Sequence, residues 1–421
     1  MTSAPVAPSG NLEKILIVGG GIGGLAAALA LARRGIASCV LERRLIFGED
    51  GAGIQIGPNG TRILEELGAA SFLKARVTAP DALRILDANT ARPIGTLPLG
   101  RWIAQRHGSP YWVAHRRDLH NALLSTAERE PLIQIRMGFD VTDVHDDADT
   151  VTATSAQNDR ARGDALIVAD GAWSGLRTGH FKGAAPSYTG KCAVRAVLPI
   201  DDVPEELHRT EVHLWLSRDV HVVHYPVSAG HAVALVAIFD DHRVAQDWST
   251  SCDGAWVSGR TAGFAPVLRE LLDRPESWRR WSLMKLSRWP GMAAGRTALL
   301  GDAAHPVLPF LAQGGVLALE DAVVVADALA ACPTDPVRAL KAYAQVRELR
   351  ARRVAKASRT NGVIYHLGGP MAAARNIALA SIAPDRFMRR YDWLYGWTPD
   401  TDRLMAEVVA PLTRNIRGAA G

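Results

Sequence analysis

The chain has 421 residues, of which 48% are hydrophobic and 22% are charged, and its formal net charge is +5. This composition predicts a globular protein of two or three domains and excludes a disordered or fibrous chain. The most apolar stretch, residues 315–331, is interrupted by three acidic residues, and residues 1–10 lack a signal-peptide pattern, so we expect neither a membrane partner nor secretion. The four cysteines are scattered without C-x-x-C or metal-ligand spacing, which favours a cytoplasmic location and no metal site.

The positive charge does not by itself indicate a nucleic-acid partner. Its densest run has helical spacing and consists of Arg347, Arg350, Arg352, Arg353 and Lys356. A solvated helix face is a better interpretation of such a run than a nucleic-acid patch, so we expect no nucleic acid among the partners. A mildly positive field would instead attract anionic substrates and pyridine nucleotides.

The first motif lies at residues 15–42. Four apolar residues predict a buried parallel strand, a helix-forming run follows, and a second strand at residues 38–41 ends on Glu42. Between the first strand and the helix stand glycines in G-x-G-x-x-G spacing: Gly19, Gly21 and Gly24. These glycines permit a tight turn, the approach of a pyrophosphate to the helix N-terminus, and close packing, while an acid at this distance binds a ribose. The motif predicts a dinucleotide site, since a plain glycine-rich turn would leave Glu42 unexplained.

The next segments add strands and helices in quick succession. Residues 51–60 contain four glycines and are either a plain loop or backbone lying against a flat ligand; a helix follows at 61–67. We expect a β-hairpin at 80–100 and a helix at 115–128. Arg116 lies near the start of that helix, where it is either a surface arginine or a contact to a bound phosphate or flavin. Residues 133–137, 141–144 and 151–154 predict a small antiparallel sheet, and 165–169 predicts another buried strand.

The second half of the chain begins with longer, alternating, aromatic-rich strands between residues 193 and 282, which predict a separate sheet-based domain. The nucleotide-binding domain resumes with a strand at 297–300, followed by helices at 316–331 and 338–360. The tail contains a Trp/Tyr cluster at 391–397, which we expect to pack onto the body or onto a second subunit.

Three motifs now stand together: GGGIGG with Glu42, DGAWSGLR at Asp170–Arg177, and GDAAHPVLPFLAQGG at Gly301–Gly315. This combination resembles the single-component FAD-dependent aromatic hydroxylases, which include p-hydroxybenzoate, salicylate and 6-hydroxynicotinate hydroxylases. The resemblance implies an α/β fold: a Rossmann-type FAD-binding domain, an inserted mixed β-sheet substrate domain and a helical C-terminal region. The implied segments are 11–79, 101–185 and 286–345 for the FAD-binding domain, 80–100 and 186–285 for the substrate domain, and 346–421 for the C-terminal region.

The resemblance also assigns FAD contacts to individual positions. Glu42 would bind the adenosine ribose, Asp302 the ribityl chain, and the helix N-terminus at Gly314 the pyrimidine end of the flavin, where reduced flavin carries negative charge. Asp170 would serve both FAD positioning and the access of the pyridine nucleotide. The full set of implied FAD-binding residues is Gly19, Gly21, Gly23, Gly24, Glu42, Arg43, Gly53, Arg116, Val141, Asp170, Asp302, Pro306, Gly314 and Gly315.

The reaction implied by the resemblance is the hydroxylation of a small phenolic, salicylate-like aromatic acid by a monomer or homodimer. NADH or NADPH would reduce the FAD, and O2 would then give a C4a-hydroperoxide that transfers one oxygen atom in a dry site. No second G-x-G-x-x-G is present, so NAD(P)H would have no domain of its own. Two alternatives stay open: an FAD-dependent reductase of the same fold without oxygen insertion, and a non-catalytic flavin-binding module.

The sheet domain offers a catalytic base. In residues 220–226, strand alternation puts His221 and Tyr225 on one face and His224 on the other. Histidine has a near-neutral pKa suited to general base catalysis, and a histidine and tyrosine four apart resemble the 6-hydroxynicotinate hydroxylase pattern. We predict that His221 is the base and that Tyr225 orients the substrate; both are otherwise ordinary strand residues at a domain interface. His224 is expected to be structural.

Two further polar residues have open roles. His305, in the GDAAHP turn, is expected to position neighbouring groups rather than to act as an acid or base. Arg195 could hold a substrate carboxylate, with an interdomain salt bridge as the equal alternative.

Overall fold

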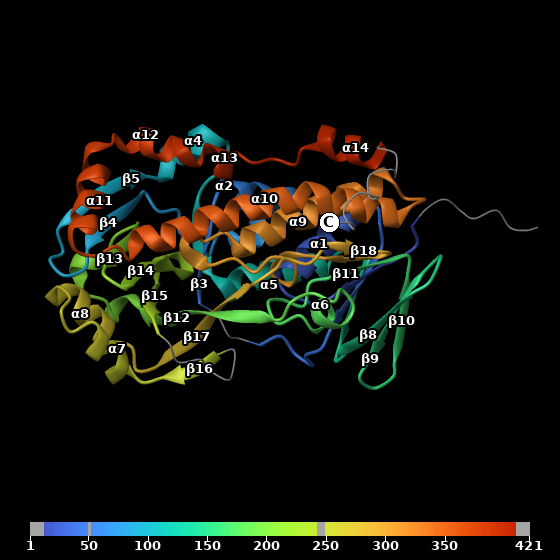
Figure 1. Cartoon of the computed structure of the whole chain (residues 1–421), viewed down its shortest axis with the longest axis horizontal. Coiled ribbons are helices and arrows are strands. Elements are labelled where there is room, and N and C mark those ends of the chain that lie inside the picture. The colour runs from blue at the N-terminus through green and yellow to red at the C-terminus, as the bar shows by residue number, and fades with distance from the viewer. Residues whose placement is uncertain (1–11, 49–51, 242–248, 410–421) are drawn as a thin grey trace, which may run out of the picture.

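The computed structural model describes residues 12–48, 52–241 and 249–409. Two large sheets follow one another along the long axis of the molecule, and the long helix α10 (Pro336–Tyr365) runs from one towards the other (Figure 1). Residue 51, part of the glycine-rich segment 51–60, lies outside the described ranges, as do residues 11 and 410–421 of the outermost segments. The division into six segments therefore stays a prediction.

The first sheet is the nucleotide-binding one. It has a parallel core on which helix α1 (Ile22–Ala32) packs, and α5 (Arg116–Ala127) and α9 (Gly314–Ala331) pack against α1. Every residue of its four inner parallel strands is buried, as continuous apolar runs predict. The strand order is β18 (Ala293–Ala294), β19 (Thr297–Leu299), β11 (Ala165–Val168), β1 (Ile15–Val18), β2 (Ser38–Glu42) and β7 (Ile133–Met137). The strands predicted at residues 15–18 and 38–41, before and after the glycine motif, are confirmed as β1 and β2.

One predicted pairing is wrong. Residues 133–137 form β7, which pairs in parallel with β2 instead of joining the small antiparallel sheet. That sheet consists of β8 (Val141–Asp146), β9 (Val151–Ser155) and β10 (Arg160–Gly163). β7 is the edge strand of its sheet and is only partly buried. Its sequence therefore alternates as any half-exposed strand does, and this pattern does not indicate which strand it pairs with.

The second sheet has eight strands and is mixed, because β13 pairs in parallel with β4 while the other pairs are antiparallel. The predicted hairpin at 80–100 forms its edge. The order is β16 (Ser249–Cys252), β17 (Trp278–Leu286), β12 (Pro186–Pro199), β15 (Ala232–Asp240), β14 (Val220–Val227), β13 (Glu211–Ser217), β4 (Ala82–Asp87) and β5 (Pro93–Pro98).

Shorter elements connect these layers. The strands β3 (Gly53–Ile56) and β6 (Trp112–His115) form a two-stranded ribbon between the domains. Because β3 and the start of the next helix cover most of the glycine-rich segment 51–60, that segment is not a plain loop. The remaining helices are α2 (Pro58–Glu66), α3 (Ala70–Leu73), α4 (Gly100–His107), α6 (Gly175–Gly179), α7 (Gly254–Arg260), α8 (Pro266–Asp273), α11 (Gly369–Ser381), α12 (Pro384–Met388), α13 (Asp392–Tyr395) and α14 (Thr401–Val409).

The basic face of α10 differs from its prediction. Arg347 is fully buried and Arg350 is 9% exposed, and both pair with carboxylates of α9. Arg350 also lies over the ring of Trp393, so the Trp/Tyr cluster of the tail packs onto the body. The prediction of a solvated face is wrong for these two arginines, because Glu320, which interrupts the apolar run of α9, is one of their buried partners. Among the described residues, no helix is long and apolar enough to cross a bilayer.

Candidate functional site

The glycine-rich turn after β1 is tight and open on one side. Gly19 has φ +100°, and a side chain there would come within 2.6 Å of the Ala169 carbonyl oxygen. A side chain at Gly24 would collide with the Gly19 carbonyl, whereas nothing lies within 4 Å of the corresponding position at Gly21. The first and third glycines are therefore needed for the fold of the turn, and the second leaves space for an approaching phosphate. Gly23 faces the interior instead, towards Leu300.

Glu42 organises the side of the turn where an adenosine would lie. Its buried carboxylate accepts hydrogen bonds from the backbone N–H groups of Gly20 (2.7 Å) and Arg44 (3.0 Å). Arg43 beside it is exposed. The backbone N–H of Phe139 donates to the Glu42 carbonyl, which brings the start of β8, and with it Val141, to the same edge of the sheet.

A second group of polar residues lies around the N-terminus of α9. Asp302 Oδ1 is 3.8 Å from the Cβ position built on Gly314, and Pro306 lies in the turn between these two residues. Burial raises the pKa of Asp302, and the positive charge of Arg116 opposes this shift. Arg116, Asp302 and Gly314 therefore form one cluster, although they lie up to about two hundred residues apart in sequence.

A buried ion network holds the Gly301–Asp302 turn in place. The Asp321 carboxylate, on α9, accepts hydrogen bonds from the Gly301 backbone N–H (2.8 Å), His305 Nε2 (2.6 Å) and Arg347 Nε (2.6 Å). Burial alone would raise the pKa of Asp321, but His305 and Arg347 outweigh it and lower the pKa to about 2. His305 is thus tied to a structural carboxylate, in keeping with a positioning role.

Three buried polar atoms near this cluster have no hydrogen-bond partner among the described residues: Asp170 Oδ1, Arg177 Nε and Arg195 Nε. Burial raises the pKa of Asp170 and lowers that of Arg195 to about 10. Unpartnered buried groups of this kind are expected where a bound group completes the site. Together with the open face at Gly21 and the N–H groups at the start of α9, they fit a bound FAD.

The strand β3 separates this cluster from the second sheet. A side chain at Gly53 would come within 2.6 Å of the Tyr225 hydroxyl, and one at Gly315 within 3.0 Å of Ile54. The backbone of β3 is therefore in close contact with β14 on one side and with the N-terminus of α9 on the other, where glycine allows the approach.

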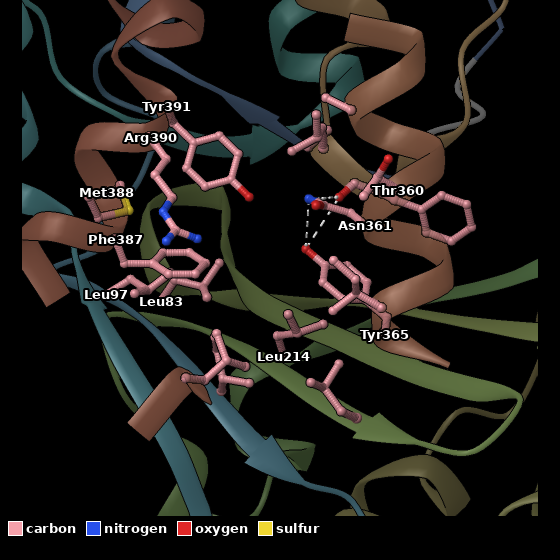
Figure 2. Close-up of a pocket in the computed structure, with 18 of the residues that line it drawn as sticks. Leu83, Leu97, Leu214, Thr360, Asn361, Tyr365, Phe387, Met388, Arg390 and Tyr391 are labelled. Atoms are coloured by element: carbon pink, nitrogen blue, oxygen red, sulfur yellow. Dashed lines mark hydrogen bonds between the residues drawn. The ribbon is translucent and has the colours of Figure 1, made fainter. Parts of the chain in front are cut away.

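A cavity of about 880 Å³ lies between the second sheet and the C-terminal helices. Figure 2 shows Leu83, Leu97 and Leu214 of the sheet on one side, and Arg390 and Tyr391 on the other. Its walls are mostly apolar, and the described residues of its polar lining include cations but no Asp or Glu. The basic lining residues are Arg353, Lys356, Arg375 and Arg390.

His221 lies in the wall of this cavity. It is 2% exposed, and its ring is 5.5 Å from that of Phe310 and 5.3 Å from that of Tyr365. Burial lowers its pKa well below the ordinary value, and the nearby His366 and Lys191 lower it further. The imidazole is therefore neutral at physiological pH, and its unprotonated nitrogen can accept a hydrogen bond. His224 lies on the opposite face of β14 and stacks on His213 at 4.5 Å.

Tyr225 does not line the cavity. It is 3% exposed, packs against Gly53 and lies beside Gln55. Gln55 does line the cavity, and it accepts a hydrogen bond from the Tyr111 hydroxyl (2.7 Å). Any effect of Tyr225 on a substrate would thus pass through Gln55. Gln55 and Tyr111 were not predicted from the sequence, although Gln55 stands within the glycine-rich segment 51–60.

Arg195 also lies outside the cavity, and its guanidinium stacks over the ring of Trp281 at 4.9 Å. No carboxylate of the described residues pairs with it, so the alternative of an interdomain salt bridge is not seen there. The cavity cations of α10 and the tail were also missed, because nothing in a single sequence indicates that these helices face the sheet.

Comparison with known proteins agrees with this geometry. A family model described as an FAD binding domain matches residues 13–358. The 3-hydroxybenzoate 6-hydroxylase of Klebsiella oxytoca is 37% identical over 93% of this chain and 98% of its own. A 3-amino-4-hydroxybenzoate 2-monooxygenase of Streptomyces platensis is 34% identical over 92% and 97%. The solved structure of a salicylate hydroxylase substrate complex superimposes with a TM-score of 0.80 at 25% identity, over 96% of this chain and 100% of that one. The chain belongs to the FAD-dependent aromatic hydroxylases, a family of FAD-dependent monooxygenases.

Proposed function

We propose that this protein hydroxylates the ring of a hydroxybenzoate-type acid, using FAD, NAD(P)H and O2. The observation that carries the proposal is the position of His221: a buried, neutral imidazole in the wall of a mostly apolar cavity. The same cavity is lined by Pro309–Ala312 and Gln55, which adjoin the cluster that fits FAD. The relatives named as 3-hydroxybenzoate 6-hydroxylases support a phenolic acid as substrate.

The charges around the cavity favour an anionic substrate. Arg353, Lys356 and Arg390 are cations of the lining, and none of the described residues that line the cavity is acidic. Arg195 lies next to Tyr225, outside the cavity, and pairs with no carboxylate of the described residues, so it adds a further positive charge. A carboxylate would be attracted into such a field, whereas a cation or a neutral hydrocarbon would gain nothing from it.

His221 would take the phenolic proton as the substrate binds, because phenolate is a better nucleophile than phenol. When bound, FAD supplies the activation of dioxygen and the transfer of one oxygen atom. The chain keeps the site dry with leucine and aromatic walls, and it holds the cofactor through the open glycine turn and the Asp302 cluster. The cavity is large for a single ring, so ring-substituted acids belong among the candidate substrates.

The test is a panel of acids: 3-hydroxybenzoate, salicylate, 3-amino-4-hydroxybenzoate, 6-hydroxynicotinate and, as a matched control, benzoate. The FAD-loaded enzyme is mixed with NADH or NADPH, and nucleotide oxidation, oxygen uptake and products are measured together. We expect at least one phenolic acid to stimulate oxidation and to give a hydroxylated product, while benzoate gives none.

The two alternatives predict different outcomes in the same assay. A reductase would oxidise NAD(P)H and reduce a substrate without consuming O2 in proportion. A non-catalytic flavin module would respond to no aromatic acid at all. Either result would contradict the proposal.

A further inference from the structure

His221 is connected to the protein surface by a continuous chain of polar groups that the catalytic proposal does not use. Its Nδ1 lies 2.8 Å from Nε2 of His366, the residue that follows α10. Nδ1 of His366 lies 3.2 Å from Asp240 Oδ1 and 3.0 Å from Lys191 Nζ, and these two residues form an ion pair. The side chain of His366 is 6% exposed, whereas that of Asp240 is 39% exposed, so this series of hydrogen-bonded groups runs from the cavity wall to solvent.

The outer end of this chain suits both neutral forms of His366. When Nδ1 carries the proton, it donates to the Asp240 carboxylate. When Nε2 carries the proton, Nδ1 is an acceptor, and the Lys191 ammonium can donate to it. A structural histidine needs one partner of fixed character, whereas a histidine that passes protons changes its donor and acceptor nitrogens at every passage. Nδ1 of His366 has both a donor, Lys191, and an acceptor, Asp240, within reach, which fits a histidine that passes protons.

The inner end also fits. Nε2 of His221 has no hydrogen-bond partner among the described residues and lies on a ring that lines the cavity. A phenolic hydroxyl in the cavity can therefore donate to Nε2 while Nδ1 stays bonded to His366. Other charged groups near His366 are Lys191 on β12, Asp240 on β15, and Asp219 in the turn between β13 and β14.

We propose that His366, Asp240 and Lys191 form a proton relay that carries the phenolic proton of the substrate from His221 to solvent. The substrate O–H bond breaks as a proton joins His221 Nε2. The proton on His221 Nδ1 passes to His366 Nε2, and the proton on His366 Nδ1 passes to the Asp240 carboxylate and then to water. The substrate is left as phenolate, and Lys191 hydrogen-bonds the emptied His366 Nδ1. No electrons are transferred in this sequence.

The relay rests on the proposed function, because it needs a phenolic ligand in the cavity. Its test uses FAD-loaded enzyme without NAD(P)H, so that no hydroxylation takes place. 3-Hydroxybenzoate is mixed with the enzyme in a stopped-flow instrument, and phenolate absorbance and a pH-indicator dye report ionisation and proton release. The variants are His366→Phe, which keeps an aromatic ring, His366→Gln, which keeps a hydrogen bond, and Asp240→Asn. The matched control is Asp219→Asn, which removes an equally charged group that is not bonded to His366.

We expect both His366 variants and Asp240→Asn to slow proton release about 10²-fold or more, the lower end of what positioned proton transfer contributes. Asp219→Asn should behave as the parent. FAD content and the Kd for benzoate, which has no phenolic proton, should stay unchanged in all variants. If a substitution had damaged the cavity instead, one or both of these values would change.

The outcomes separate the relay from the hydroxylase proposal. Parental proton release in His366→Gln, or a parent enzyme that binds the acid without forming phenolate, would overturn the relay alone. Slowed release in the variants, together with the absence of any hydroxylated product from the parent, would support the relay and overturn the hydroxylase. If no phenolic acid perturbs the flavin spectrum, both proposals are wrong.

Discussion

Replacing Asp321 by asparagine tests whether the buried ion network holds the cofactor turn. Asp321 is fully buried and accepts hydrogen bonds from Gly301, His305 and Arg347. Asparagine keeps the shape and one acceptor oxygen, but it removes the charge and leaves two buried basic side chains with a weaker partner. Arg347 retains its contact with Glu320 at 2.9 Å, which limits the damage.

The expected loss in the free energy of unfolding follows from these contacts. Removing one partner of a buried ion pair costs about 3–5 kcal/mol, and the remaining contact with Glu320 favours the lower end. The lowering of the Asp321 pKa from 3.8 to about 2 corresponds to roughly 2 kcal/mol, which agrees in order of magnitude. Because the folded-state pKa is depressed, this contribution is fully present above about pH 4 and is lost as the pH falls through 2.

The assay is urea unfolding at neutral pH and between pH 4 and 2, with flavin occupancy read from absorbance. We expect Asp321→Asn to lose about 3 kcal/mol at neutral pH, to bind FAD more weakly, and to depend less on pH in the acid range than the parent. Asp327→Asn on the same helix is the control, because its pair with Arg34 is partly exposed and is worth about 0–1 kcal/mol. A stability within 1 kcal/mol of the parent together with full FAD occupancy would refute this reasoning.

Three other substitutions probe the site. Asp302→Ala should purify largely colourless, because it removes the carboxylate beside the N-terminus of α9; full flavin occupancy would contradict the assignment. His221→Asn should keep FAD but lose coupled hydroxylation by about 10²-fold or more, measured as product formed per NAD(P)H oxidised. Gly53→Ala should displace Tyr225, whose hydroxyl lies 2.6 Å from the new methyl position, and raise the KM for the aromatic acid; an unchanged KM would show that β3 has room to move.

Much of the fold was predictable where the pattern is local. Continuous apolar runs predicted β1 and β11, and alternation predicted β14, with bounds that agree to within one residue. The partner of β7 was not predictable, because an edge strand with one exposed face has the same pattern in either sheet. The burial of Arg347 was not predictable either, because its carboxylate partners lie 26 and 27 residues earlier in the sequence, within an apolar helix.

In the candidate site, too, local patterns were predictable and tertiary contacts were not. Strand alternation placed His221 and His224 on opposite faces of β14, as the structure has them. The contact of His366 with Lys191 joins residues 175 positions apart, and no motif surrounds either of them. The C-terminal helices supply half of the cavity wall for the same reason: their place over the sheet depends on tertiary packing, which a single sequence does not display.

The most direct test of the hydroxylase proposal is the fate of molecular oxygen. The FAD-loaded enzyme is supplied with NAD(P)H, 3-hydroxybenzoate and the other phenolic acids under oxygen-18 gas, and the products are analysed by mass spectrometry. The proposal predicts a hydroxylated acid that carries one oxygen-18 atom, formed in proportion to the nucleotide oxidised. Unlabelled acid with all the oxygen recovered as hydrogen peroxide, or no oxygen consumption with any acid, would contradict it.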